Sequence, residues 1–359
     1  MKSTIILLAL MLAFSSAFAQ KGKVTSAQTL KEAGKIDEAF TTIEQTVDPS
    51  NPKAEKTIPW AKTWEVRGEI FQAIGQSTDE SIKKLSDDPL TEALNSYKKA
   101  LELDTKGNNE KSVKIKLTLL TNDLTNQAIN AFQVENYDLA LSSFEQILEV
   151  NDMPIVKADS PDAVDTVIIF NAGLAAYNGG DYEKAITYYK ESAKYGYNGP
   201  RTYNLISASY QMMKDTTAAL ESLREGYTKY PDDNAILESM IQIYMDLDKT
   251  DEALANLEKA IAQDPTKPRY YFAQGALYEK MSNEEKAIET YKKTLEVDPD
   301  FFNAYYNLGA LYYNKGVQQS EVAKEVPANE NEKYEAEMKK ADDWFAEALP
   351  YMEKCNELE

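Results

Sequence analysis

The sequence repeats itself at a fixed offset of 34 residues, and this repetition constrains the fold more than any other feature. At that offset Gly275 falls on Gly309, while Pro231 falls on Pro265 and then on Pro299. Four uninterrupted repeats share this register, at residues 166–199, 200–233, 234–267 and 268–301. Each short repeat can bury apolar surface only against its neighbours, so the chain is predicted to fold as an elongated array.

Each repeat carries two stripes with helical spacing. In the repeat 268–301 the first stripe consists of Tyr271, Gln274, Gly275 and Tyr278, and the second of Ala287, Tyr291 and Thr294. The first four fall at i, i+3, i+4 and i+7, which places them on one face of a helix. Gly275 lets the second helix approach closely, and Pro299 ends that helix because proline cannot continue the backbone hydrogen bonding. The pattern predicts a helical hairpin.

The packing positions recur from repeat to repeat. The small residue of the second helix is Ala185, Ala219, Ala253 and Ala287 in turn, and the bulky residue four positions later is Tyr189, Leu223, Leu257 and Tyr291. The glycine of the first helix is less regular, since the four repeats have Gly173, Ser207, Ile241 and Gly275 there. A branched side chain at Ile241 is expected to widen that helix crossing.

The period and these positions resemble the tetratricopeptide repeat, which also has 34 residues. The resemblance implies an all-α fold, a right-handed superhelical solenoid of about eight helix-turn-helix units. The expected divisions are residues 20–154 with divergent units and an enlarged loop near 75–89, an insert at 155–165, four regular units at 166–301, and a final unit at 302–359 that contains a charged helical insertion. The roles of the inserted segments 76–92 and 314–347 stay open.

The first 19 residues have the features of a signal peptide. Lys2 provides the positive charge, an apolar stretch follows it, and Ala17-Phe18-Ala19 is a small-x-small cleavage site. The apolar stretch is shorter than the ~20 residues that span a bilayer. The sequence therefore predicts an exported protein without a transmembrane segment, located in the periplasm or on the outer surface of a bacterium.

The residues that most catalytic sites use are scarce. The chain has no histidine and one cysteine, Cys355, so Ser-His-Asp triads, Cys-His pairs and His or multi-Cys zinc sites are excluded. A net charge of −20 would repel nucleic acid. We therefore expect no enzyme activity, no catalytic residue, no cofactor and no metal site.

The resemblance also implies where a partner binds, because related repeats hold partners on the concave face lined by their first helices. Carried onto this sequence, the groove comprises Phe170, Tyr177, Arg201, Asn204, Gln211, Met212, Glu238, Gln242, Met245, Arg269, Phe272, Glu279, Tyr306 and Tyr313. Aromatic rings among adaptable polar groups are typical of peptide-binding surfaces. Packing between adjacent repeats is an equally good interpretation for Phe170 and Phe272.

These features favour a non-catalytic scaffold of the cell envelope that binds a protein or peptide in its concave groove. Two alternatives stay open: a regulatory region associated with an envelope enzyme, and a module that binds a glycan such as peptidoglycan. The final repeat also lacks the extra helix that usually covers the end of such an array. We therefore also expect this uncovered C-terminal end to dock a partner or a second copy of the chain.

Overall fold

The computed structural model describes residues 21–231, 233–247 and 249–358, except for the side chains of Asn234, Met245, Lys259 and Gln263. The proposed signal peptide at 1–19 lies outside the described residues. Residues 21–32 are helical, and no strand occurs in the described part of the chain. The remaining elements are α2 (Ile36–Val47), η1 (Ala54–Lys56), α3 (Ala61–Gln76), α4 (Glu80–Lys83), α5 (Pro89–Leu103), α6 (Glu110–Gln133), α7 (Tyr137–Asp152), α8 (Pro154–Lys157), α9 (Thr166–Gly179), α10 (Tyr182–Lys194), α11 (Gly199–Met212), α12 (Thr216–Lys229), α13 (Asn234–Asp246), α14 (Thr250–Gln263), α15 (Pro268–Lys280), α16 (Glu284–Val297), α17 (Phe302–Lys324) and α18 (Asn331–Leu358).

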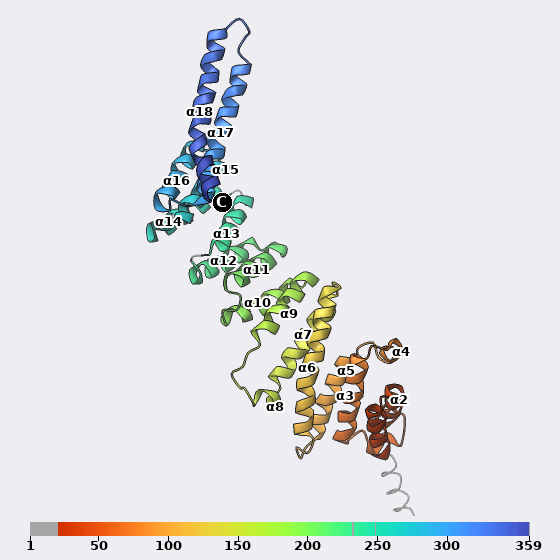
Figure 1. Cartoon of the computed structure of the whole chain (residues 1–359). Helices are drawn as coiled ribbons and strands as arrows, with labels where there is room; N and C mark the ends of the chain where they lie inside the picture. The colour runs from red at the N-terminus through yellow and green to blue at the C-terminus, as the bar shows by residue number, and fades with distance from the viewer. Residues whose placement is uncertain (1–20, 232, 248, 359) are drawn as a thin grey trace, which may run out of the picture. The chain divides into compact units, whose positions relative to one another are not determined.

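The chain forms two compact units, residues 1–197 and 198–359, which we call the N-terminal and the C-terminal unit. Within the first, α3 packs on α5, α6 on α7 and α9 on α10. Within the second, the pairs are α11 with α12, α13 with α14, α15 with α16, and α17 with α18 (Figure 1). The prediction of an all-α array of helical hairpins is confirmed. None of the described helices is long and apolar enough to cross a membrane.

A recurring turn joins the two helices of a hairpin. One residue of this turn adopts a left-handed backbone conformation, at Gly34, Glu135, Gly180, Lys214 and Ser282. At Asn136, Asp181, Asp215 and Asn283 the following side chain accepts a backbone N–H bond and caps the second helix. The N–H of that capping residue also bonds back to the first helix, for instance from Asp181 to the Ala176 carbonyl at 2.9 Å. This combination satisfies the free backbone groups at both helix ends.

A buried tyrosine ring on the second helix covers a glycine on the first. A Cβ at Gly275 would lie 2.6 Å from the ring of Tyr291, and one at Gly173 would lie 2.8 Å from that of Tyr189. Both rings are 0% exposed. Ile241 occupies the glycine position of its repeat, and it borders a cavity of about 310 Å³ that is lined by residues of α12, α13 and α14. The branched side chain thus coincides with a looser crossing.

Several segments depart from the regular hairpin. The connection between α3 and α5 contains the single-turn helix α4, and α8 lies between α7 and α9. The inserted residues of the last repeat lie in α17 and α18, which have 23 and 28 residues. These two helices pack side by side (Figure 1). A single helix runs through Pro350.

A cluster of charged groups joins α3 to α6 in the N-terminal unit. Glu65 is only 1% exposed and receives bonds from Ser112 at 2.5 Å, from Lys62 at 3.1 Å and from Lys116. Lys116 also lies 2.7 Å from Glu69, which is paired with Lys31. Two turns after Lys116 on α6, Asp123 accepts bonds from Gln72 and Gln76, at 2.6 and 2.9 Å. Every carboxylate of this contact therefore has a hydrogen-bonding partner.

The partners decide the ionisation of the buried carboxylate. Burial opposes the charged form of Glu65, but the hydrogen bonds from Lys116 and Ser112 and the positive charges of Lys116 and Lys62 outweigh it. The pKa of Glu65 is therefore below its ordinary value of 4.5. Its contribution to stability is fully present above that ordinary value and is lost as the pH falls through the lowered pKa.

Changing Lys116→Met should lower the free energy of unfolding by about 3–5 kcal/mol, because it leaves a buried carboxylate without its main counter-charge. The loss should shrink as the pH falls, because without Lys116 burial raises the pKa of Glu65 and the carboxylate of the variant takes up a proton more readily. Urea unfolding followed by circular dichroism at pH 7 and pH 4 measures both effects. Lys111→Met, an exposed change on the same helix, is the matched control and should have little effect. Equal losses in both variants would contradict the importance of this cluster.

Adding one methyl group at Gly275 should destabilise the C-terminal unit by about 1–3 kcal/mol, since the Tyr291 ring has to move. Gly22→Ala provides the control, because Gly22 is an exposed helical residue with nothing within 4 Å of the added methyl. The Gly22→Ala change should stabilise the protein by up to about 1 kcal/mol, because alanine has a better helix propensity than glycine. Thermal unfolding of the two variants should shift in opposite directions, and a shift in the same direction would refute the packing argument.

Candidate functional site

The C-terminal unit brings four of the predicted groove residues around one hollow. Glu238 and Gln242 come from α13, and Arg269 and Phe272 from α15. Together with Leu237, Ile241, Ala273, Ala276, Phe301 and Asn303 they line a cavity of about 230 Å³, which we call the α13–α15 cavity. The prediction placed these four side chains on the groove face of two successive first helices, with Glu238 and Phe272 at the same repeat position, and the structure places them together.

The α13–α15 cavity has an aromatic wall and a polar edge. The Phe272 ring is part-buried, with its centre 5.5 Å from that of Tyr291 and 5.2 Å from that of Phe301. On the opposite wall Glu238 and Gln242 are exposed, and Gln242 donates to Asp246 at 2.7 Å. Carboxylate and amide groups can accept from and donate to the backbone of a bound peptide. An apolar side chain can meanwhile contact the phenylalanine.

Two exposed tyrosines lie on the neighbouring helix α17. Tyr306 is 55% exposed and Tyr313 is 53% exposed. They are seven residues apart, which puts them on the same face of the helix. The Tyr313 ring packs against Phe345, with 5.3 Å between centres, whereas Tyr306 is the more open of the two. Both offer a ring surface together with a hydroxyl group.

The other predicted groove residues of the C-terminal unit differ in accessibility. Arg201, Gln211 and Met212 are exposed on α11, and Asn204 is part-buried there. Glu279 is exposed and accepts a bond of 2.8 Å from the Tyr291 hydroxyl, so it orients the buried ring of its own hairpin. The side chain of Met245 lies outside the described residues.

In the N-terminal unit the assignment of Phe170 to the groove is wrong. Its ring is 3% exposed and packs between those of Tyr189 and Tyr197, with 5.5 Å to each centre. Phe170 therefore belongs to the core, which was the alternative interpretation of this position. Tyr177 is part-buried and packs edge-on against Tyr182 at 5.6 Å.

Sequence reasoning did not predict the other six residues that line the α13–α15 cavity, and two of them, Asn303 and Phe301, come from the next repeat boundary. Asn303 stands at the same repeat position as Arg201 and Arg269, so the 34-residue register alone could have identified it. Phe301 immediately precedes α17, outside the helix positions that the register considers. The 34-residue register therefore gave no indication that Phe301 lines the cavity.

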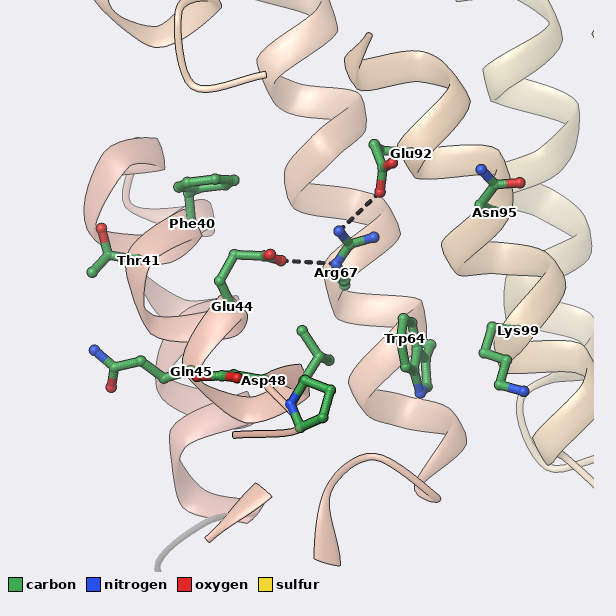
Figure 2. A pocket seen from close by; sticks show the side chains of 12 residues that line it. Phe40, Thr41, Glu44, Gln45, Asp48, Trp64, Arg67, Glu92, Asn95 and Lys99 are labelled. Carbon is green, nitrogen blue, oxygen red and sulfur yellow. Dashed lines mark hydrogen bonds and ion pairs between the residues drawn. The ribbon is translucent and has the colours of Figure 1, made fainter. Parts of the chain in front are cut away.

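A larger hollow lies in the N-terminal unit, between α2, α3 and α5 (Figure 2). It has a volume of about 880 Å³ and is lined by Phe40, Thr41, Glu44, Gln45, Val47, Asp48, Pro49, Trp64, Arg67, Glu92, Asn95 and Lys99. We call it the Arg67 groove. No residue in it was predicted to bind anything, because the three helices contribute side chains that are far apart in the sequence.

Arg67 is the centre of this groove. Its guanidinium donates from Nε to Glu44 at 2.8 Å, and its Nη2 lies 2.9 Å from Glu92 (Figure 2). Its Nη1 donates to Ser96 at 2.8 Å. It also lies over the ring of Phe71, 4.2 Å from its centre. The side chain is only 12% exposed, so it links the three helices and forms the floor of the groove.

Comparison with known families agrees with this architecture. A family model described as tetratricopeptide repeat matches residues 125–198 and 170–234, and one described as TPR repeat matches residues 242–282 and 284–316. The chain therefore contains tetratricopeptide repeats. No curated protein matches the sequence.

Solved structures of repeat proteins show limited similarity. A TPR repeats protein from Bacteroides fragilis is 26% identical, with 66% of this chain and 91% of that one covered and a TM-score of 0.33. MamA is 25% identical over 52% of this chain and 96% of its own, with a TM-score of 0.32. YrrB, described as a TPR protein with an unusual peptide-binding site, is 19% identical over 60% of this chain and 98% of its own, with a TM-score of 0.31. With scores this low, the repeat assignment depends on the family models.

Proposed function

We propose that the protein is a non-catalytic scaffold that binds an extended peptide segment of a partner protein along α13, α15 and α17. The observation that carries this proposal is the α13–α15 cavity, where Glu238, Gln242, Arg269 and Phe272 come together from two successive repeats. The tetratricopeptide repeats support a role in protein interaction.

The chemistry of this surface suits a peptide. The cavity of about 230 Å³ is large enough for one side chain of a ligand, and the part-buried Phe272 gives that side chain an apolar contact. Exposed polar groups around it can pair with the ligand backbone, which would otherwise lose its hydrogen bonds to water. Tyr306 and Tyr313 extend the surface with rigid rings, which contribute contact area at a low cost in conformational entropy.

The proposed location is the bacterial cell envelope. It is supported by the charged start, apolar stretch and Ala17-Phe18-Ala19 site in the sequence. A mature chain that begins at Gln20 would be released as a soluble protein. Mass spectrometry of the protein from its native cells tests this, since an N-terminus at Met1 would contradict export by cleavage.

One observation favours a second candidate function, the binding of a glycan. Tyr306 and Tyr313 are both more than half exposed on one face of α17, so their rings are accessible to a sugar. Sugar rings and peptide side chains can both pack on tyrosine, and the two ligands differ in what else they need. A peptide should also depend on the α13–α15 cavity, whereas a glycan should depend on the tyrosines alone.

The peptide proposal predicts that a photo-crosslinking benzoylphenylalanine at position 306 captures a specific protein in the native cells. The same group at position 334 is the matched control, because Tyr334 is 44% exposed on α18 in the same unit. Mass spectrometry identifies the captured protein and the attached segment. We expect capture from position 306, and a loss of that capture by about tenfold when Gln242→Ala is added, since polar and apolar contacts to the cavity are then weakened.

The outcomes separate the alternatives. Equal capture from positions 306 and 334 would contradict a specific peptide site. Capture that is unaffected by Gln242→Ala would move the site away from the cavity. Failure of protein capture, together with retention on purified peptidoglycan that Tyr306→Ala abolishes, would support the glycan function instead.

Self-association through the last repeat is part of the same proposal. Leu349 is 56% exposed on α18, which gives this end an apolar contact point. Light scattering over a range of concentrations should show a dimer that Leu349→Lys converts to a monomer, because a buried ammonium opposes association. Ala346→Lys, at another exposed position of α18, is the control and should affect association less. A strict monomer at all concentrations would refute this part.

A further inference from the structure

We infer that the Arg67 groove is a second docking site, which takes a lysine- or arginine-bearing segment of a partner polypeptide. The groove lies in the N-terminal unit, and none of its residues contributes to the peptide surface proposed above. The inference therefore goes beyond the proposed function and does not depend on it. It follows from the saturation of Arg67, the excess of carboxylates and the apolar lining.

Arg67 itself is not a receptor for an anion. Its three guanidinium nitrogens already contact Glu44, Ser96 and Glu92 at 2.8–2.9 Å. Its side chain is 12% exposed, and the Phe71 ring lies beneath the guanidinium. A carboxylate or phosphate ligand would have to displace an existing ion pair while meeting two glutamates. The groove therefore disfavours anions.

The charges that remain favour a cation. One guanidinium is shared by Glu44 and Glu92, which contact it through a single oxygen each. Asp48 adds another carboxylate, and the bonds from the Ser50 hydroxyl and N–H hold the pKa of Asp48 below its ordinary value, so it is ionised at neutral pH. Lys99, the other cation of the lining, is bonded to both oxygens of Glu102, at 2.8 and 2.9 Å. The lining thus carries three carboxylates against Arg67 and Lys99, and Lys23, a cation beside the lining, donates to Gln45 at 2.9 Å.

The apolar part of the lining suits the alkyl portion of a basic side chain. Phe40, Val47 and Trp64 are part-buried along the groove, and Pro49 lies at its exposed edge. The indole is held in place because its Nε1 donates to the Ile58 carbonyl at 2.7 Å. Lysine and arginine bury their methylene stems on such surfaces while the charged head stays near acids and water. The rings also attract the positive charge itself.

The size of the groove indicates a segment and not a single residue. A volume of about 880 Å³ exceeds that of one side chain and falls in the range of sites for larger ligands, about 300–1,000 Å³. Glu44 and Glu92 stand on different helices, α2 and α5, on either side of Arg67 (Figure 2). A segment with two basic residues can therefore place one near each carboxylate.

Calorimetric titration with a terminally blocked peptide of alternating lysine and alanine tests the inference at physiological salt. The same peptide with acetylated lysines is the ligand control, since acetylation keeps the stem and removes the charge. A protein in which Trp60 and Trp344 are replaced by Phe reports on the groove through the emission of Trp64. We expect the lysine peptide to bind and to change this emission, and the acetylated peptide to do neither.

Asn95 allows a variant that removes no existing interaction of Arg67, because it is an exposed lining residue on α5. Asn95→Lys places a competing ammonium in the groove and should weaken binding by about tenfold or more. Asn95→Glu should strengthen it. Asn122→Lys, the same change at an exposed position of α6 in the same unit, should weaken it by less than about twofold, since salt screens distant charges.

Each remaining outcome overturns the inference. Equal binding of the acetylated peptide would show an apolar occupant. Equal weakening by Asn95→Lys and Asn122→Lys would show attraction by the net charge of −20 without a specific site. Binding that leaves the Trp64 emission unchanged would place the ligand elsewhere, and absence of binding would exclude basic peptides.

Discussion

The contact between a glycine on the first helix and a buried ring on the second is the packing on which the hairpins α9–α10 and α15–α16 depend. At Gly173 and Gly275 the missing Cβ leaves the space that Tyr189 and Tyr291 fill. The ring can then be buried completely because its hairpin partner offers backbone instead of a side chain. Where Ile241 interrupts this arrangement, a cavity is lined by residues of α12, α13 and α14. The residue at the glycine position of the first helix therefore affects how closely the helices pack at that repeat.

The first helices have one face that the contacts with their own second helix do not use. The two described units use that face differently. In the N-terminal unit the contact between α3 and α6 is occupied by paired charges around Glu65 and Lys116. In the C-terminal unit the corresponding helices α13 and α15 enclose an aromatic cavity, and α17 presents two open tyrosines. The ion cluster stabilises its unit, whereas the cavity and the tyrosines are available to a ligand.

The polar groups of the Arg67 groove show how one buried charge can organise a surface. Arg67 connects α2, α3 and α5 through Glu44, Ser96 and Glu92, and in doing so it holds two carboxylates at the sides of a hollow. A single guanidinium cannot neutralise both. The structural role of the arginine thus leaves an acidic surface beside the fixed ring of Trp64.

The sequence by itself determined the hairpins, their period and the all-α fold, since these follow from local spacing: the alanine of the second helix recurs every 34 residues, and so does the proline that ends it. The same register placed Glu238, Gln242, Arg269 and Phe272 on the groove face of two successive first helices, and the structure groups them. It could not distinguish Phe170 from Phe272, because both occupy the same repeat position. Only the tertiary structure decided that Tyr189 and Tyr197 enclose the first, whereas the second borders an open cavity. The Arg67 groove also required the tertiary structure, because Glu44, Arg67 and Glu92 come from three helices and have no common spacing until those helices pack together.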